Sequence, residues 1–263
     1  MTQQDRHDAI IALVKRQGYA AIEQLATEFN VTPQTIRRDL NQLAEEGAVR
    51  RVHGGAGLES STVNTAYHTR KTLNLEAKRR IAELLVTQIP DSASLFINIG
   101  TSNEFIAEAL CQHSGLEVIT NNLNVAAILQ HKTDFNVIVA GGQVRSRDGG
   151  IIGEATIDFI NQFKVDYGII GISGIDRDGS LLEFDYQEVR VAQAIIRNSR
   201  KVYLAADHSK FQRNAVVRQG NLSQVDAFFT DRQPPDTLVR LMHEHGVELH
   251  VAGEPVAAQA TAD

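Results

Sequence analysis

From Ser94 onward the chain alternates short apolar runs with longer amphipathic segments, and this alternation restricts the fold more than any other feature. Seven runs have the length and composition of buried strands, and five segments space their apolar residues as helices do. The strand-like runs are SLFINI, LEVIT, FNVIVA, VDYGIIGIS, KVYLAAD, VDAFFT and VELHVA, and the helical segments are SNEFIAEALCQH, LNVAAILQH, EATIDFINQF, DYQEVRVAQAIIRNS and PDTLVRLMHEH. Repeated βα units predict an α/β domain with a mainly parallel sheet covered on both faces.

The chain of 263 residues is long enough for this domain and a second, smaller one. Its 43% hydrophobic residues can form a sizeable core, and no apolar run approaches the roughly 18 residues of a membrane span. The polar N-terminus has no signal-peptide core, and the single cysteine, Cys111, excludes an intramolecular disulfide. We therefore expect a cytoplasmic protein without membrane contact.

The first 57 residues predict three helices and a β-hairpin. Apolar side chains recur at helical spacing before Gly18 and again in IEQLATEF. In the third helix Thr32 can cap the N-terminus and Pro33 fits the first helical position. The inward side chains of that helix, which we expect to run to Gly47, are Ile36, Leu40 and Leu43. AVRRVHGGA then alternates and turns at its paired glycines, as a β-wing would.

A helix-turn-helix followed by a wing predicts sequence-specific DNA binding. The outward side of the third helix carries amide, hydroxyl and guanidinium groups, which suit base edges and phosphates in a major groove. Basic side chains on the wing would hold the flanking backbone. The expected DNA-binding residues are Thr32, Gln34, Thr35, Arg37, Arg38, Asn41, Arg50, Arg51 and His53. A solvated helix in an ordinary helical subdomain is the alternative interpretation of the helix alone.

The charge balance makes DNA binding depend on local patterning. The whole chain has a net charge of −6, whereas residues 1–57 hold seven basic and seven acidic residues. Bulk charge therefore argues against a nonspecific polyanion binder. One winged helix covers too short a half-site for useful specificity, so we also expect self-association into a dimer or tetramer.

Polar groups gather where the predicted strands end. Gly100-Thr101-Ser102 follows a strand and opens a helix, an arrangement that can surround an anion with backbone N–H groups and hydroxyls. Ligands of such sheets bind at the carboxyl ends of the strands. The candidate effector-binding residues are Gly100, Thr101, Ser102, Thr120, Asn121, Asn122, Gly142, Arg145, Ser173, Gly174, Asp176, Asp207 and Lys210. Each alone also fits a turn, a cap or a solvated residue, but together they favour a small phosphorylated, hydroxylated ligand.

An isomerase-like enzyme is the main alternative for the α/β domain. Asp176, Glu183 and Asp207 offer carboxylates as bases, and Lys210 could stabilise an oxyanion. A DNA-reading domain on the same chain favours a sensor instead, so we expect no catalytic residues and no cofactor.

The histidines of HEHGVELH do not indicate a metal site. The first two, His243 and His245, lie two residues apart on a predicted helix and face apart, so we expect solvated side chains and no metal.

Across nearly its whole length the chain resembles the DeoR family of bacterial transcription regulators. The resemblance rests on VTPQTIRRDLNQLAEEG with HGGA, and on SSTVNTAYHTRK, TNNLNVA, AGGQVRSRDGGIIGEATIDFI and GISGIDRDGSLLEFDYQEVR. It implies a repressor released from operator DNA by a small phosphorylated polyol, glycerol 3-phosphate, or by another sugar or polyol phosphate.

The resemblance also implies a fold and a phosphate site. The family's sensor domain is similar to ribose-5-phosphate isomerase, which implies that Gly100, Thr101 and Ser102 hold the phosphate with Lys210 as a charge partner. Asn98 stands where members commonly carry an aspartate.

These features divide the chain into four parts. We expect a winged helix-turn-helix DNA-binding domain at 1–57 and a polar linker at 58–75. An α/β effector-binding and oligomerisation domain would span 76–252, starting with a helix that Pro90 ends, and 253–263 would be a disordered tail.

Overall fold

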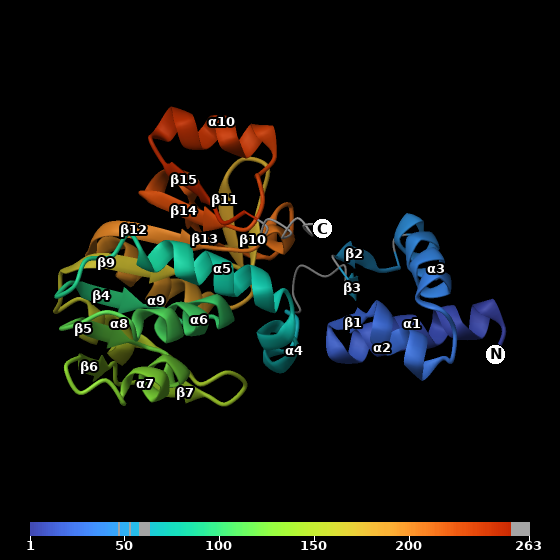
Figure 1. The fold of residues 1–263 in the computed structure, drawn as a ribbon, viewed down its shortest axis with the longest axis horizontal. Helices are drawn as coiled ribbons and strands as arrows, with labels where there is room; N and C mark the ends of the chain where they lie inside the picture. The colour runs from blue at the N-terminus through green and yellow to red at the C-terminus, as the bar shows by residue number, and fades with distance from the viewer. Residues whose placement is uncertain (47, 53, 58–63, 254–263) are drawn as a thin grey trace, which may run out of the picture.

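The computed structural model describes residues 1–46, 48–52, 54–57 and 64–253 of the chain (Figure 1). A small N-terminal domain lies beside a larger α/β domain. Within the described ranges no helix is both long and apolar enough to cross a membrane.

The small domain has the three predicted helices, the predicted wing and one further strand. Its helices are α1 (Gln3–Gln17), α2 (Ile22–Glu28) and α3 (Pro33–Glu45). The wing is an antiparallel hairpin of β2 (Arg50–Val52) and β3 (Gly55–Gly57), and the unpredicted β1 (Tyr19–Ala21) pairs with β3. Gly55 permits this pairing, because a Cβ there would lie 2.2 Å from the carbonyl oxygen of Ala20.

Local signals set the helix ends in this domain. Thr2 caps α1 by accepting a hydrogen bond from the Asp5 amide, and Gly18 ends it with φ at 77°. Thr32 caps α3 by accepting from the Thr35 amide at 3.2 Å, and Pro33 occupies the first turn, as predicted.

Seven parallel strands form the central sheet of the larger domain, in the order β15-β14-β12-β9-β4-β5-β6. Their bounds are β4 (Ser94–Ile97), β5 (Glu117–Thr120), β6 (Asn136–Val139), β9 (Val165–Ile170), β12 (Ser199–Ala205), β14 (Ala227–Thr230) and β15 (Glu248–Val251). Each overlaps one of the seven predicted runs, so the predicted parallel sheet is confirmed. The chain runs outward from β4 to β6 and then crosses to β9, which makes the β4–β9 boundary the point where the strand order reverses.

Helices cover both faces of this sheet, as Figure 1 shows. The helices α5 (Leu75–Val86), α6 (Thr101–Leu110) and α7 (Leu123–Leu129) pack on one face, and α8 (Glu154–Ile160), α9 (Tyr186–Arg197) and α10 (Asp236–His245) pack on the other. Consecutive residues of β4 point to opposite cores: Leu95 and Ile97 join the α5–α7 core, and Phe96 joins the α8–α10 core.

Several short elements were not predicted. β7 (Gln143–Arg145) and β8 (Gly150–Ile152) form a hairpin, and β10 (Gly174–Ile175), β11 (Ser180–Glu183) and β13 (Val217–Asn221) form a small antiparallel sheet. Two 3-10 turns, η1 (His208–Lys210) and η2 (Leu222–Gln224), join later strands.

Part of the stretch predicted to be a polar linker forms a helix that was not predicted, α4 (Tyr67–Thr72). This helix has no buried residue, which agrees with the lack of an apolar period in its sequence. Two helices also end earlier than predicted, α3 at Glu45 and α5 at Val86. His53, residues 58–63 of the linker and residues 254–263 of the tail lie outside the described residues.

Candidate functional site

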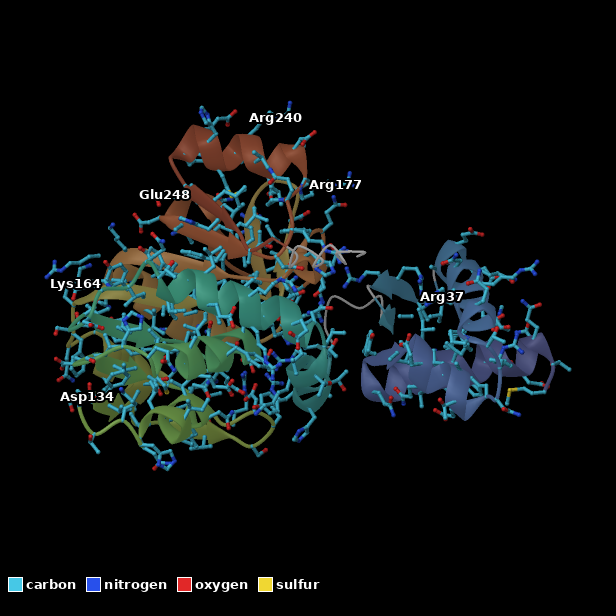
Figure 2. All side chains as sticks on the ribbon, in the orientation of Figure 1. Arg37, Asp134, Lys164, Arg177, Arg240 and Glu248 are labelled. Atoms are coloured by element: carbon cyan, nitrogen blue, oxygen red, sulfur yellow. The ribbon has the colours of Figure 1, made fainter. Side chains whose placement is uncertain are left out.

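Helix α3 presents polar side chains on the side away from the domain core. The predicted inward residues Ile36, Leu40 and Leu43 are buried. The exposed residues of the predicted reading face are Gln34, Arg37, Arg38 and Asn41, and Figure 2 labels Arg37. Thr35 is half-buried, and its hydroxyl lies 2.9 Å from that of Thr32. The four long polar side chains are therefore in solvent, where a major groove could receive them.

One charged residue on α3 faces inward and was not predicted to do so. Asp39 is 1% exposed and accepts hydrogen bonds from Arg6 Nε at 2.6 Å and Nη2 at 3.0 Å. Its Oδ1 also lies 3.2 Å from His7 Nε2. Burial opposes ionisation, but Arg6 and His7 outweigh it and hold the pKa of Asp39 below its ordinary value. The carboxylate therefore connects α3 to α1. Asp39 lies three residues after the buried Ile36, and this helical spacing was the feature of the sequence that could have predicted its inward position.

The two wing arginines have different surroundings. Arg51 is half-buried and donates to the Gly55 carbonyl oxygen at 3.0 Å, which braces the hairpin. Arg50 lines a cavity at the junction of the two domains, together with Arg70, Lys210 and Arg213. Arg50 thus faces the larger domain.

A polar pocket, partly open to solvent, lies where the strand order reverses. The segments after β4 and β9 form two of its walls. Its lining residues are Arg70, Ile99, Gly100, Thr101, Ser102, Gly171, Ile172, Ser173, Glu183, Glu188 and Lys210. Open α/β sheets bind ligands in such a crevice, at the carboxyl ends of the strands.

The N-terminus of α6 offers unused amide groups to this pocket. The first hydrogen bond of the helix runs from the Glu104 amide to the Gly100 carbonyl at 3.2 Å. No side chain of the described residues caps the helix. The amides of Thr101 and Ser102 thus have no partner within the helix and can donate to an anion.

The pocket combines basic and acidic side chains. Burial lowers the pKa of Lys210, Asp207 opposes this, and the neighbouring cations Arg213, Lys78 and Arg70 add to it, so that the pKa comes to about 7. Burial and the nearby Glu188 raise the pKa of Glu183 above its ordinary value. An anion near Lys210 would favour its charged form, and a hydroxyl could bind to the carboxyl groups.

Three predicted residues hold the end of β5 and do not line the pocket. Thr120 donates to the Ile97 carbonyl oxygen at 2.7 Å, and Asn121 Nδ2 donates to the Ile151 carbonyl oxygen at 3.1 Å. Asn122 caps α7 by accepting from the Asn124 amide. These polar groups fix the loops around the pocket.

Arg145 belongs to an ion-pair cluster. It contacts Asp148 at 2.7 Å, Glu188 at 2.8 Å and Asp185 at 2.9 Å. Because Glu188 lines the pocket, Arg145 can position that carboxylate without reaching the pocket itself.

The remaining predicted residues lie outside the lining. Asp207 is buried beside Lys210 and accepts from Asn74 Nδ2 at 2.8 Å. Asp176 accepts from the Arg177 amide in a turn, and Gly142 precedes β7. A Cβ on Gly174 would lie 2.0 Å from the Arg213 carbonyl oxygen, which indicates a packing role.

Arg70 and Glu188 line the pocket and were not predicted to bind a ligand. Both lie in stretches that carry the family resemblance, HTRK and YQEVR, and this was the only signal for them. No apolar period or strand end marks either residue.

Comparisons with known proteins match both domains of the chain to one family. Residues 6–62 match the DeoR-like helix-turn-helix domain, and residues 73–232 match the DeoR C terminal sensor domain. These matches define the class of protein: a transcription regulator in which a sensor domain is joined to a DNA-binding domain. The chain belongs to the DeoR family.

Its relatives include repressors of one regulon. The chain is 57% identical to the glycerol-3-phosphate regulon repressor of Escherichia coli (strain K12) over 95% of this chain and 100% of that protein. It is 50% identical to the protein of the same name from Haemophilus influenzae, over 95% of this chain and 97% of that protein. Among solved structures, ribose 5 phosphate isomerase A from Neisseria gonorrhoeae is similar with a TM-score of 0.36 and 17% identity, covering 51% of this chain and 52% of that one.

Proposed function

We propose that this protein is a transcriptional repressor of glycerol-3-phosphate metabolism genes that glycerol 3-phosphate releases from operator DNA. The observation that carries the proposal is the polar pocket at the point of strand reversal, in a chain that also has an exposed reading helix. The high identity to glycerol-3-phosphate regulon repressors supports the choice of regulon. Such a regulator acts on chromosomal DNA in the cytoplasm.

The chemistry of the pocket suits a phosphorylated polyol. The phosphate would accept hydrogen bonds from the amides and hydroxyls of Thr101 and Ser102, with Lys210 supplying a positive charge. Glu183, Glu188 and Ser173 would bind the hydroxyl groups of the polyol. A ligand without a phosphate would lose the first set of contacts.

Arg37, Arg38, Gln34 and Asn41 would read base edges in this proposal, and Arg51 would contact the backbone. Arg50 lies at the domain junction and would reach DNA only if the two domains move relative to each other.

Catalysis is the alternative function. A carboxyl with a raised pKa beside a lysine, as Glu183 and Lys210 provide, is also suited to general acid–base chemistry. We propose that the pocket binds its ligand unchanged, because the relatives are repressors. Incubating the protein with ribose 5-phosphate and glycerol 3-phosphate and following both by NMR would detect turnover, which would contradict this assignment.

The proposal can be tested by operator binding in the presence of a panel of ligands. A duplex that the protein selects from a random pool would serve as the operator. We expect glycerol 3-phosphate to weaken binding by about 5–150-fold, the range of typical coupling energies. Glycerol should have no effect. A response to a different sugar phosphate alone would reassign the effector, and no response to any of them would contradict the sensor function.

A further inference from the structure

The linker between the two domains is attached to the wall of the effector pocket. Arg213 Nη2 donates to Asn64 Oδ1 at 2.8 Å, and its Nη1 donates to the Ser173 carbonyl oxygen at 3.2 Å. Asn64 Nδ2 in turn donates to Ser173 Oγ at 3.3 Å. Asn64 is therefore hydrogen-bonded directly to a residue that lines the pocket, Ser173.

Helix α4 brings a second linker residue into the same pocket. Arg70 lines it and is held there by α4, whose Tyr67 hydroxyl donates to the buried Glu104 carboxylate at 2.9 Å. Asn124 Nδ2 adds a hydrogen bond to the Tyr67 oxygen at 3.1 Å. The helix is therefore docked on the sensor domain by polar contacts, which can rearrange without exposing an apolar core.

The ion pair between Arg70 and Asp148 is weak. Arg70 Nη2 lies 3.6 Å from Asp148 Oδ2, beyond hydrogen-bond distance. Asp148 is already neutralised by Arg145, whose Nε and Nη2 donate to its two oxygens at 2.8 and 2.7 Å. A dianionic phosphate at the α6 N-terminus would offer Arg70 a stronger, bidentate partner.

Movement of Arg70 would reach the DNA-binding domain through the backbone of the linker. Arg70 Nε donates to the Thr65 carbonyl oxygen at 3.1 Å. Thr65 packs against the end of α1, where a Cβ on Gly18 would lie 2.9 Å from the Thr65 Cα atom. A displacement of Thr65 would therefore press on, or withdraw from, the helix-turn-helix domain.

We propose that Arg70 is a phosphate ligand supplied by the linker, and that residues 64–70 transmit effector binding to the DNA-binding domain. This inference rests on the proposed function. Effector binding draws Arg70 from Asp148 toward the phosphate, and the clamp of Asn64, Ser173 and Arg213 rearranges with it. The two arrangements of the linker then hold the DNA-binding domain in different positions. The effector favours the arrangement with Arg70 at the phosphate, and operator DNA favours the other.

Two substitutions separate the binding step from the transmission step. Arg70→Gln removes the ligand charge, so glycerol 3-phosphate should bind the full-length protein about tenfold or more weakly. Asn64→Ala keeps every proposed ligand group, so effector affinity should change little. The loss of operator affinity caused by the effector should shrink at least severalfold.

Matched variants control for fold and charge. Arg79→Gln removes a half-exposed cation of α5 that pairs with Glu76 on the same helix and does not line the pocket, and it should leave both measurements as in the wild type. Arg213→Lys keeps the charge but cannot bond to both Asn64 and Ser173 as the guanidinium does. The effector should therefore weaken operator binding less than in the wild type, as in Asn64→Ala.

The measurements are calorimetric titration with glycerol 3-phosphate and anisotropy of a labelled operator duplex. Wild-type effector affinity in Arg70→Gln, or full coupling in Asn64→Ala and Arg213→Lys, would overturn this inference and leave the proposed function intact. A wild-type protein that binds no glycerol 3-phosphate would overturn both.

Discussion

Asp39 is a buried carboxylate on the helix that carries the predicted DNA-reading side chains. Its hydrogen bonds to Arg6 and its contact with His7 fix the rotation of α3 on α1. The orientation of Arg38 and Gln34 toward DNA depends on that rotation. The ion pair is surrounded by the apolar core of the small domain, where an unpaired charge is costly.

Removing the carboxylate should unfold the small domain more easily. Asp39→Ala leaves the Arg6 guanidinium without its partner and should lower stability by about 3–5 kcal/mol, as breaking a buried pair does. The pKa of Asp39 is lower in the folded protein than in the unfolded chain. The ionised carboxylate therefore contributes its full stabilisation above the pKa of the unfolded chain, and this stabilisation is lost as the pH falls through the pKa of the folded protein. Urea unfolding of wild type and variant at pH 7 measures this. A Gln34→Ala control should be neutral, and a loss below about 1 kcal/mol in Asp39→Ala would contradict the role.

Two arginines of the small domain, one on α3 and one on the wing, should affect DNA binding in different ways. Arg38→Ala should weaken operator binding by about 1–3 kcal/mol and relax the preference at one base pair. Arg51→Ala should weaken specific and random duplexes alike and lower the salt dependence. Anisotropy titrations with both duplexes at several salt concentrations compare them. Equal effects of both substitutions on both duplexes would refute the separation of base and backbone contacts.

Lys210 should take up a proton when an anion binds. Its pKa of about 7 in the free protein leaves it mostly neutral at pH 8, and a neighbouring dianionic phosphate would raise that pKa again. Since the folded pKa lies below that of the unfolded chain, the free protein should also gain stability from this group as the pH rises above 7. Calorimetry of glycerol 3-phosphate binding at pH 8 in two buffers with different ionisation enthalpies counts the protons. Lys210→Gln should abolish the uptake, and equal heats for the wild type in both buffers would contradict it.

The strands of the central sheet follow from the sequence, and those of the smaller sheets in the same domain do not. The five inner strands of the central sheet are largely buried and the edge strands β6 and β15 are partly buried, and each of the seven contains an apolar run that stands out from its neighbours. The strands β7, β8, β10 and β11 are only two to four residues long, and α4 buries no side chain. Their positions depend on contacts between distant segments, which no local period records.

The same distinction applies to the pocket. Gly100, Thr101 and Ser102 were predictable because a strand end followed by a helix start has a local signature. Arg70 and Glu188 reach the pocket from α4 and α9, and only the folded chain places them there. Asn121 and Asn122 do not line the pocket, and Asn121 Nδ2 and Asn122 Oδ1 bond to backbone groups, because buried loop ends need partners for their own amides and carbonyls.

The α6 N-terminus should be necessary for the response and dispensable for DNA binding. Thr101→Leu replaces a buried hydroxyl at the proposed phosphate position with a larger apolar group. Operator affinity should stay within about twofold, and glycerol 3-phosphate should no longer weaken it. The same change at the exposed Thr133 is the matched control and should respond normally. A normal response of Thr101→Leu would place the phosphate elsewhere.

At the scale of the whole molecule, one DNA-reading domain is too small for a specific operator. A single winged helix gives only a short half-site, so the repressor should bind DNA as a dimer or tetramer through contacts of its larger domain. Sedimentation of the full chain at micromolar concentration should show an oligomer. Half-sites in the selected duplexes should be spaced by about one helical turn or a multiple of it. A monomer with full operator affinity would contradict this expectation.

The response of the whole molecule is a coupling between two sites, and coupling free energies are reciprocal. If glycerol 3-phosphate weakens operator binding by a given factor, operator DNA must weaken glycerol 3-phosphate binding by the same factor. The most direct measurement is a calorimetric titration of the wild-type protein with glycerol 3-phosphate, with and without saturating operator. We predict an affinity about 5–150-fold lower in the presence of operator, equal to the factor found in the operator titration. Identical effector affinity with and without operator would contradict effector-controlled repression by this protein.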